Sequence, residues 1–217
     1  MPAKKIPVIE RIMGANDDVA LQNRALLDAH HVHTINVMAS PGAGKTTLIM
    51  DAIKALVGKR RVGAIEGDLA SDVDTQRVIE AGAPAVQINT GGGCHLDAPQ
   101  VQEALPLLPL DELDLVFIEN VGNLVCPVSF ALGEHTRMAI SSVPEGDDKP
   151  LKYPTIFANV DALVISKIDL LPYIPFDMAK FEERARGLNP DIRIFAVSCV
   201  TGEGMDEWIS WLQDVSG

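Results

Sequence analysis

Residues 39–47 combine a turn-forming segment, a lysine and a hydroxyl in the order that phosphate binding requires. The segment reads Ala-Ser-Pro-Gly-Ala-Gly-Lys-Thr-Thr, the Walker A pattern with Ala39 in place of the first glycine. Gly42 and Gly44 let backbone N–H groups turn toward phosphate oxygens. Lys45 offers a charge to the β- and γ-phosphates, and Thr46 offers a hydroxyl to Mg²⁺. The residues expected to line this phosphate site are Pro41, Gly42, Ala43, Gly44, Lys45, Thr46 and Thr47.

The segment Ser166-Lys167-Ile168-Asp169 resembles the N-K-x-D motif with which G proteins read guanine. The Asp169 carboxylate can accept two N–H bonds from the Watson–Crick edge of guanine, whereas adenine presents the wrong donors and acceptors. Ser166 replaces asparagine, so the bond that ties neighbouring loops together is expected to be weaker. A second base-contacting loop is predicted where the next strand ends. The expected guanine contacts are Lys167, Asp169, Ser198, Cys199 and Val200.

Acidic residues follow two predicted strands at the ends that face the ligand in an open α/β sheet. Asp68, Asp72 and Asp74 are candidates to hold Mg²⁺ or to orient the attacking water. Glu119 stands at the position of the aspartate in the D-x-x-G motif, and Gly122 is expected to sense the γ-phosphate through its N–H. The residues expected to serve the reaction are Lys45, Asp68, Asp74 and Glu119, and those expected to hold Mg²⁺ are Thr46, Asp68, Asp74 and Glu119.

A second cluster has the chemistry of a nickel or zinc site. Cys94, His95 and Cys126 are borderline-soft ligands, one short of a tetrahedral set. Neighbouring residues of a strand point to opposite sides, so Cys94 and His95 share a metal only if Gly91–Gly93 bends the backbone. Otherwise they reach different metals, or ligands are shared across a two-fold axis. The cluster His30, His31 and His33 is not expected to bind metal.

Short apolar runs alternate with helical patterns, which predicts an α/β fold: a single P-loop NTPase domain with a mostly parallel central sheet and helices on both faces. Residues 1–217 are expected to form one G domain with a helical extension over about residues 1–32, including a helix at Val19–Leu27. Met138–Val143 is expected as an edge strand and Ser142–Tyr153 as a loop. The predicted strands are Thr34–Ala39, Arg61–Glu66, Ala85–Asn89, Leu113–Asn120, Ala162–Lys167 and Ile192–Ser198. Helices are predicted at Thr46–Gly58 and Asp72–Ala81, around Met178–Leu188 and around Met205–Leu212.

Composition excludes several classes of protein. The chain has 217 residues and a net charge of −12, so no basic face for nucleic acid is expected. Its apolar runs are too short for a transmembrane helix. Met1–Arg11 lacks the apolar region of a secretory signal, and three cysteines are typical of a reducing cytosol, so a cytoplasmic location is expected.

Together these segments resemble the hydrogenase nickel-incorporation GTPases of the HypB family, a branch of the SIMIBI-class P-loop G proteins. The most specific segments are S-P-G-A-G-K-T-T, E-G-D, G-C-H-L-D-A, E-N-V-G-N-L-V-C-P and E-G-D-D-K-P-L-K-Y-P. The resemblance covers nearly the whole chain from Asn16. It implies GTP hydrolysis coupled to nickel handling, with Cys94, His95 and Cys126 as nickel or zinc ligands near the interface of a GTP-promoted homodimer. It also implies other hydrogenase-maturation proteins as partners.

Two departures and three alternatives qualify this resemblance. Residues 1–15 contain no cysteine motif and the chain has no long histidine tract, so metal delivery rather than storage is expected. The alternatives are a urease-type nickel GTPase, a nucleotide-gated metal carrier whose hydrolysis is incidental, and a P-loop kinase acting on a small molecule. The kinase is disfavoured because no arginine-rich lid is evident.

Overall fold

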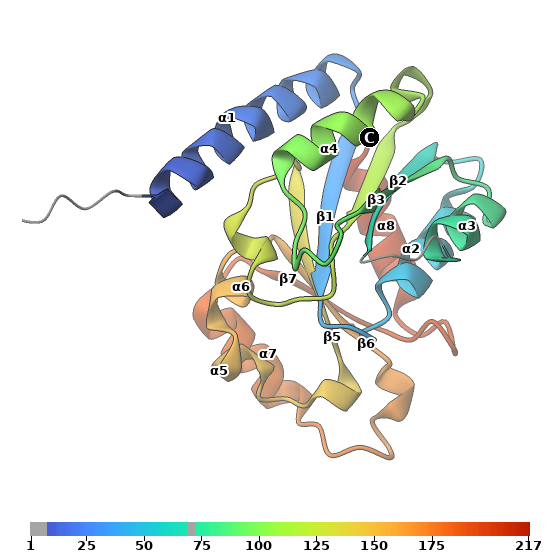
Figure 1. The fold of residues 1–217 in the computed structure, drawn as a ribbon. Coiled ribbons are helices and arrows are strands. Elements are labelled where there is room, and N and C mark those ends of the chain that lie inside the picture. The colour runs from blue at the N-terminus through green and yellow to red at the C-terminus, as the bar shows by residue number, and fades with distance from the viewer. Residues whose placement is uncertain (1–7, 69–72) are drawn as a thin grey trace, which may run out of the picture.

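The computed structural model describes residues 8–68 and 73–217, and in them the chain forms a seven-stranded sheet covered by helices on both faces (Figure 1). The strand order is β3-β2-β4-β1-β5-β6-β7, and each described pairing is parallel. The strands are β1 His33–Ala39, β2 Val62–Asp68, β3 Ala85–Asn89, β4 Leu115–Glu119, β5 Thr136–Ser142, β6 Ala162–Ser166 and β7 Arg193–Val197. This confirms the predicted fold class.

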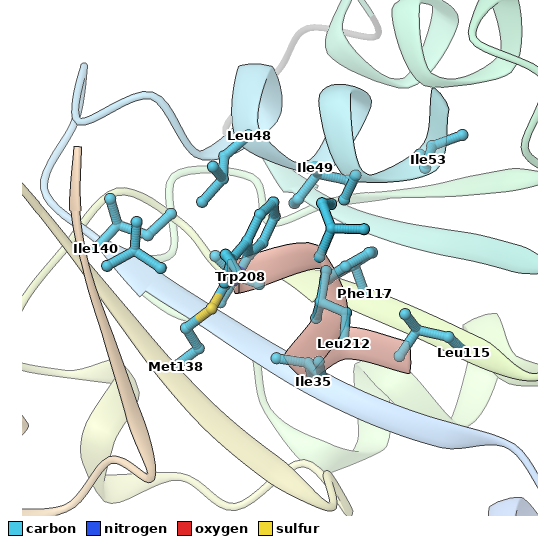
Figure 2. Packing of buried hydrophobic residues seen from close by; sticks show 14 of the residues in the cluster. Ile35, Leu48, Ile49, Ile53, Leu115, Phe117, Met138, Ile140, Trp208 and Leu212 are labelled. Carbon is cyan, nitrogen blue, oxygen red and sulfur yellow. The ribbon is translucent and has the colours of Figure 1, made fainter. Parts of the chain in front are cut away.

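The helices form the two outer layers of the sandwich. They are α1 Val8–Ala29, α2 Lys45–Leu56, α3 Val73–Glu80, α4 Ala98–Ala104, α5 Lys149–Lys152, α6 Pro154–Ala158, α7 Met178–Leu188 and α8 Met205–Val215. On one face, α2 and α8 bury Leu48, Ile49 and Trp208 against the sheet (Figure 2). On the other face, α1 and α4 lie side by side over one half of the sheet, and α6 and α7 cover the other half (Figure 1). Both faces of the central strands are thus buried under helices, which explains why these strands are continuous apolar runs.

The N-terminal helix α1 is longer than the predicted Val19–Leu27 and is fastened to the domain by buried polar side chains. Asn23 Nδ2 donates to the carbonyl oxygens of Ala98 and Leu132, each at 2.9 Å. Gly133 has φ +100°, and a Cβ atom there would lie 2.6 Å from Cβ of Asn23. Only glycine permits this approach, so the helix and the loop before β5 form one packed unit.

Two sequence predictions were wrong about local structure. Met138–Val143 is not an edge strand, because β5 lies between β1 and β6 and is covered on both faces. Ser142–Tyr153 is not a plain loop, because it contains a 3-10 turn at Val143–Glu145 and the helix α5. Its prolines stand in the first turns of these helices, where a missing N–H costs little. A capping box, with Ser142 N donating to Glu145 Oε2 at 2.8 Å, starts the first turn.

Within the described residues, no helix combines the length and the apolar character needed to cross a bilayer.

Candidate functional site

The phosphate loop connects the buried strand β1 to the first turn of α2. Gly42 and Gly44 have φ values of +75° and +100°, which the turn requires and which other residues rarely adopt. Lys45 and Thr46 follow and are both only 9% exposed. They open onto a cavity of ≈ 510 Å³ at the carboxyl ends of β1, β2 and β4. The cavity is lined by Pro41, Gly42, Gly44, Lys45, Thr46, Thr47, Glu66, Gly67, Asp68, Asp74, Thr75, Arg77, Glu119, Asn120, Val121, Gly122 and Lys167.

Glu119 at the end of β4 is the centre of the polar contacts in this cavity. Its Oε1 accepts a hydrogen bond from Thr46 Oγ1 at 3.1 Å and lies 3.8 Å from Lys45 Nζ. Its Oε2 has no hydrogen-bond partner among the residues that the structure describes. A buried carboxylate oxygen beside a threonine hydroxyl is a donor set that suits a hard divalent cation. The residues present therefore fit Mg²⁺.

A second buried carboxyl, Glu66, lies beside Glu119 in the register of β2 and β4. It is 3% exposed, and its Oε1 lacks a hydrogen-bond partner within the described part of the chain. Burial first, and the charge of Glu119 second, raise the pKa of Glu66 well above its usual range. Burial likewise raises the pKa of Glu119. Sequence reasoning passed over Glu66, although the two-residue period of a strand puts it on the same face as Asp68.

The other predicted acids differ in how well they are placed. Asp68 and Asp74 both border the cavity. Asp74 Oδ1 accepts from Arg77 Nη1 at 3.0 Å, and Arg77, which sequence reasoning did not single out, borders the cavity as well. Asp72 lies outside the described residues.

The segment predicted to read guanine is bonded to the phosphate loop. Lys167 has φ +61° and its Nζ donates to Gly42 O at 2.7 Å. Ser166 Oγ donates to Ala43 O at 2.7 Å, so this serine still ties the loops together in place of the usual asparagine. Ser166 is buried, so this bond is shielded from solvent.

Asp169 and the loop after β7 come together beside that segment. Ser198 Oγ donates to Asp169 Oδ1 at 2.6 Å and accepts from the N–H groups of Val200 and Thr201 at 3.2 and 3.1 Å. Burial first, and Asp51 second, raise the pKa of Cys199 to about 12, so its thiol is neutral. The structure therefore gathers the predicted base contacts around Asp169, although of these residues Lys167 alone borders the phosphate cavity.

The structure also brings the three predicted soft-metal ligands to one point. The ligand atoms of Cys94, His95 and Cys126 all lie within 4.8 Å of one another, and Cys94 Sγ is 3.4 Å from His95 Nδ1. Gly91 and Gly92 have φ values of +59° and +97°, so the backbone bends as a shared site requires. Among the described residues, His30, His31 and His33 belong to no such group.

The surroundings of the trio favour ligand chemistry. The ring of His95 stacks on Phe130, with centroids 4.0 Å apart. Burial lowers the pKa of His95, which favours the neutral imidazole that metals bind. The neighbouring side chain of Cys126 raises the pKa of Cys94, so a metal ion that binds there must displace the proton of this thiol. Cys94 is exposed, so a metal ion can enter and leave the trio from solvent.

Comparison with known proteins gives consistent similarities. Residues 33–196 match the family described as the CobW/HypB/UreG nucleotide-binding domain. The chain is 47% identical to hydrogenase maturation factor HypB of Escherichia coli over 202 residues, which cover 93% of this chain and 70% of that protein. The crystal structure of HypB from Helicobacter pylori in complex with nickel has a TM-score of 0.89 at 36% identity and covers 93% of this chain and 95% of that chain. HypB from Archaeoglobus fulgidus has a TM-score of 0.88 at 38% identity, covering 94% and 100%.

Proposed function

Because this chain belongs to the HypB branch of the CobW/HypB/UreG nucleotide-binding family, we propose that it hydrolyses GTP to GDP and phosphate. We further propose that hydrolysis serves nickel delivery during hydrogenase maturation. The observation that carries the proposal is that one domain contains both a phosphate cavity and a cluster of three soft-metal ligands. The proposal treats the chain as a single G domain with an N-terminal helical extension.

The phosphate chemistry follows from the cavity. Phosphoryl transfer depends on positioning and on neutralising the charge of the phosphate oxygens. Lys45 is held in the cavity beside Glu119, and Gly42, Gly44 and Thr46 of the loop line the same space. Thr46 and Glu119 would hold Mg²⁺, with Asp68 and Asp74 at the border of the site. When bound, the cation would offset charge on the β- and γ-phosphates. Asp68 and Asp74 are the candidates to orient the attacking water.

Guanine selectivity is assigned to Asp169, supported by Lys167 and by the loop Ser198–Val200. The Ser198 hydroxyl holds one oxygen of the Asp169 carboxylate, which leaves the other to accept from the base. A site built for hydrogen bonding rejects a ligand that leaves its polar groups unpaired. Adenine is such a ligand here.

Nickel is the proposed cargo, with zinc as the competing ion. Two thiols and a neutral imidazole suit either metal, and three protein ligands leave a coordination position open. The open position and the exposure of Cys94 fit a metal that is passed on. We propose that GTP promotes a homodimer that closes over the trio and that other hydrogenase-maturation proteins receive the metal in the cytoplasm.

The test is phosphate release from GTP by the purified chain, with Mg²⁺ present and no acceptor added. We expect release from GTP and little from ATP, at a slow rate that a partner protein would raise. Absence of release from GTP, with or without nickel and partner, would refute the hydrolysis proposal. Transfer of phosphate only when a small-molecule acceptor is supplied would favour the kinase alternative.

The exposure of the metal trio also favours a second candidate, a nucleotide-gated metal carrier in which hydrolysis is incidental. Metal transfer to an apo-hydrogenase subunit separates the two. If the non-hydrolysable analogue GMPPNP supports repeated transfer as well as GTP does, the chain is a gated carrier. Transfer that stops after one round with GMPPNP supports coupling to hydrolysis.

A further inference from the structure

Two asparagines, Asn120 and Asn123, flank Gly122 between the nucleotide cavity and the metal trio, and the proposed function gives neither a role. The structure shows that each side chain reaches across to the segment Gly93–Leu96, which carries Cys94 and His95 and which we term the metal loop.

Gly122 lies directly against the phosphate loop. A Cβ atom added to Gly122 would lie 2.9 Å from Pro41 Cγ and 3.0 Å from Pro41 N. Real Cβ atoms essentially never lie under 3.0 Å from another non-bonded atom, so a side chain at this position would force the phosphate loop to shift. Gly122 also borders the cavity that the phosphates would occupy. A change in the phosphate loop therefore acts on Gly122 without an intervening element.

Asn120 precedes Gly122 and holds the backbone on the buried side of this glycine. Its side chain is fully buried, and its Oδ1 accepts from Leu96 N and from Val121 N, each at 3.0 Å. Its Nδ2 donates to Asn36 Oδ1 in β1 at 3.2 Å. One carboxamide thus joins the metal loop, the residue before Gly122 and the strand that leads into the phosphate loop.

Asn123 follows Gly122 and holds the backbone on the solvent side of this glycine. Its Nδ2 donates to Cys94 O at 3.0 Å, and its Oδ1 accepts from Val125 N at 2.9 Å. The first bond holds the backbone of one thiol ligand. The second shapes the turn that leads to Cys126. The half-buried side chain of Asn123 thus bonds to the backbone of one thiol ligand and to the backbone of the residue before the other.

The metal loop is seated firmly enough to transmit a displacement. Leu96 is fully buried, and a Cβ atom at Gly67 would lie 2.8 Å from Leu96 Cδ1, so the end of β2 has no room for a side chain there. At the other end of the metal loop, Gly93 N donates to Thr90 O at 3.1 Å, and Thr90 N in turn donates to Asp68 O at 3.0 Å. Because the metal loop is held at both ends, a displacement of its backbone at Cys94 or Leu96 also moves the side chains of Cys94 and His95.

We infer that Asn120 and Asn123 are positioning residues that couple nucleotide state to nickel affinity by fastening the metal loop to both sides of Gly122. The inference rests on the proposed function, because it needs both ligands to bind. Coupling is a ratio of affinities and is separate from either affinity alone. Loss of an asparagine bond should therefore lower the ratio while the cavity and the trio persist.

The test measures nickel affinity by competition with a chromogenic chelator, in the GMPPNP–Mg²⁺ form and in the GDP–Mg²⁺ form of the full chain. Asn123→Ser is the main variant, because serine can still accept from Val125 N but does not reach Cys94 O. Asn120→Ser is the second variant. Asn159→Ser is the matched control, since Asn159 Nδ2 makes one exposed bond to Thr155 O at 2.8 Å, far along the chain.

We expect the nickel affinities of the GMPPNP and GDP forms of the wild type to differ by a factor of about 5 to 150. In Asn123→Ser this ratio should fall to about 1–3, while GDP affinity and melting temperature stay close to wild type. Asn159→Ser should keep the wild-type ratio. An unchanged ratio in Asn123→Ser, or an equal fall in Asn159→Ser, would overturn the inference. A wild-type ratio of one would also overturn the inference, because nucleotide state would then not affect nickel affinity at all. Failure of the wild type to bind nucleotide or nickel would instead refute the proposed function.

Discussion

The nucleotide cavity and the metal trio lie at neighbouring strand ends but are built in opposite ways. Lys45, Thr46 and Glu119 are buried side chains fixed by the ends of α2 and β4. Cys94 and Cys126 are exposed or half-buried side chains on bent loops. The first arrangement places buried groups on regular elements, which suits the preorganisation that phosphoryl transfer requires. The second permits entry and exit of a metal ion, which a delivery protein requires.

The contrast indicates where each site gets its geometry. The cavity is shaped by regular elements whose positions the sheet determines. The trio is shaped by backbone turns and by side-chain bonds from its neighbour, so it depends on the segment around Gly122. Damage to the cavity should leave the trio able to bind metal, and damage to the trio should leave nucleotide binding intact.

The largest effect is expected for Lys45→Ala. Removing a charge aimed at the phosphates should lower the hydrolysis rate by about 10²–10³-fold, because that charge acts on the transition state in a buried site. Phosphate release measured under single-turnover conditions gives the number. Nickel affinity in the nucleotide-free form should be unchanged.

The matched control is Lys54→Ala on the same helix, since Lys54 is exposed and its one ion pair within the described residues is with Asp51 at 3.7 Å. It should hydrolyse GTP normally. Loss of nickel binding in Lys45→Ala would break the separation of the two regions.

Cys126→Ser tests the separation from the other side. Loss of one thiol should lower nickel affinity by about 10–100-fold or more, since even outer-shell partners contribute that much. The thiolate-to-nickel absorption band should weaken in the same titration. GDP affinity should remain at the wild-type value, and a parallel loss of GDP binding would show that the trio supports the cavity.

Much of the cavity could be predicted from the sequence, because its residues follow strands whose apolar runs are easy to recognise. The Walker A segment, Glu119 and Asp169 all lie where strand ends were expected. Glu66 was missed because it was counted as part of a strand, although the same alternation turns it into the cavity. Local sequence motifs therefore predict the site residues correctly where the ends of strands and helices determine the positions of those residues.

The metal trio could be predicted only as a set of ligand types. Spacing left open whether Cys94 and His95 face one metal, because the answer depends on the φ angles of Gly91 and Gly92. The loop that contains these glycines is also held by long-range contacts such as Asn123 Nδ2 to Cys94 O, which no local pattern encodes. The central position of β5 was missed for a similar reason, since strand order is a property of the whole sheet.

Asp169→Asn sharpens the account of the cavity's base end. The change replaces a charged acceptor with an amide, so preference for GTP over ATP should fall by about 10–100-fold, the value of a hydrogen bond to a charged group. Competition of GDP and ADP against a fluorescent nucleotide measures it. Unchanged selectivity would remove Asp169 from this role and point to the loop after β7.

The smallest effect is expected for Phe130→Leu beside the trio. The stacked contact with His95 is worth about 0.5–1.5 kcal/mol, so nickel affinity should fall by roughly 2–10-fold without loss of stoichiometry. The chelator competition assay resolves this range. A larger fall with loss of one equivalent would mean that Phe130 maintains the ligand geometry itself.

The most direct test of the account is a calorimetric titration of the wild-type chain with GMPPNP and Mg²⁺, performed with and without one equivalent of nickel. Linkage requires each ligand to alter the affinity of the other by the same factor. We predict saturable binding whose dissociation constant shifts when nickel is present, and a different shift for GDP. No saturable signal, or identical isotherms with and without nickel for both nucleotides, would contradict the account.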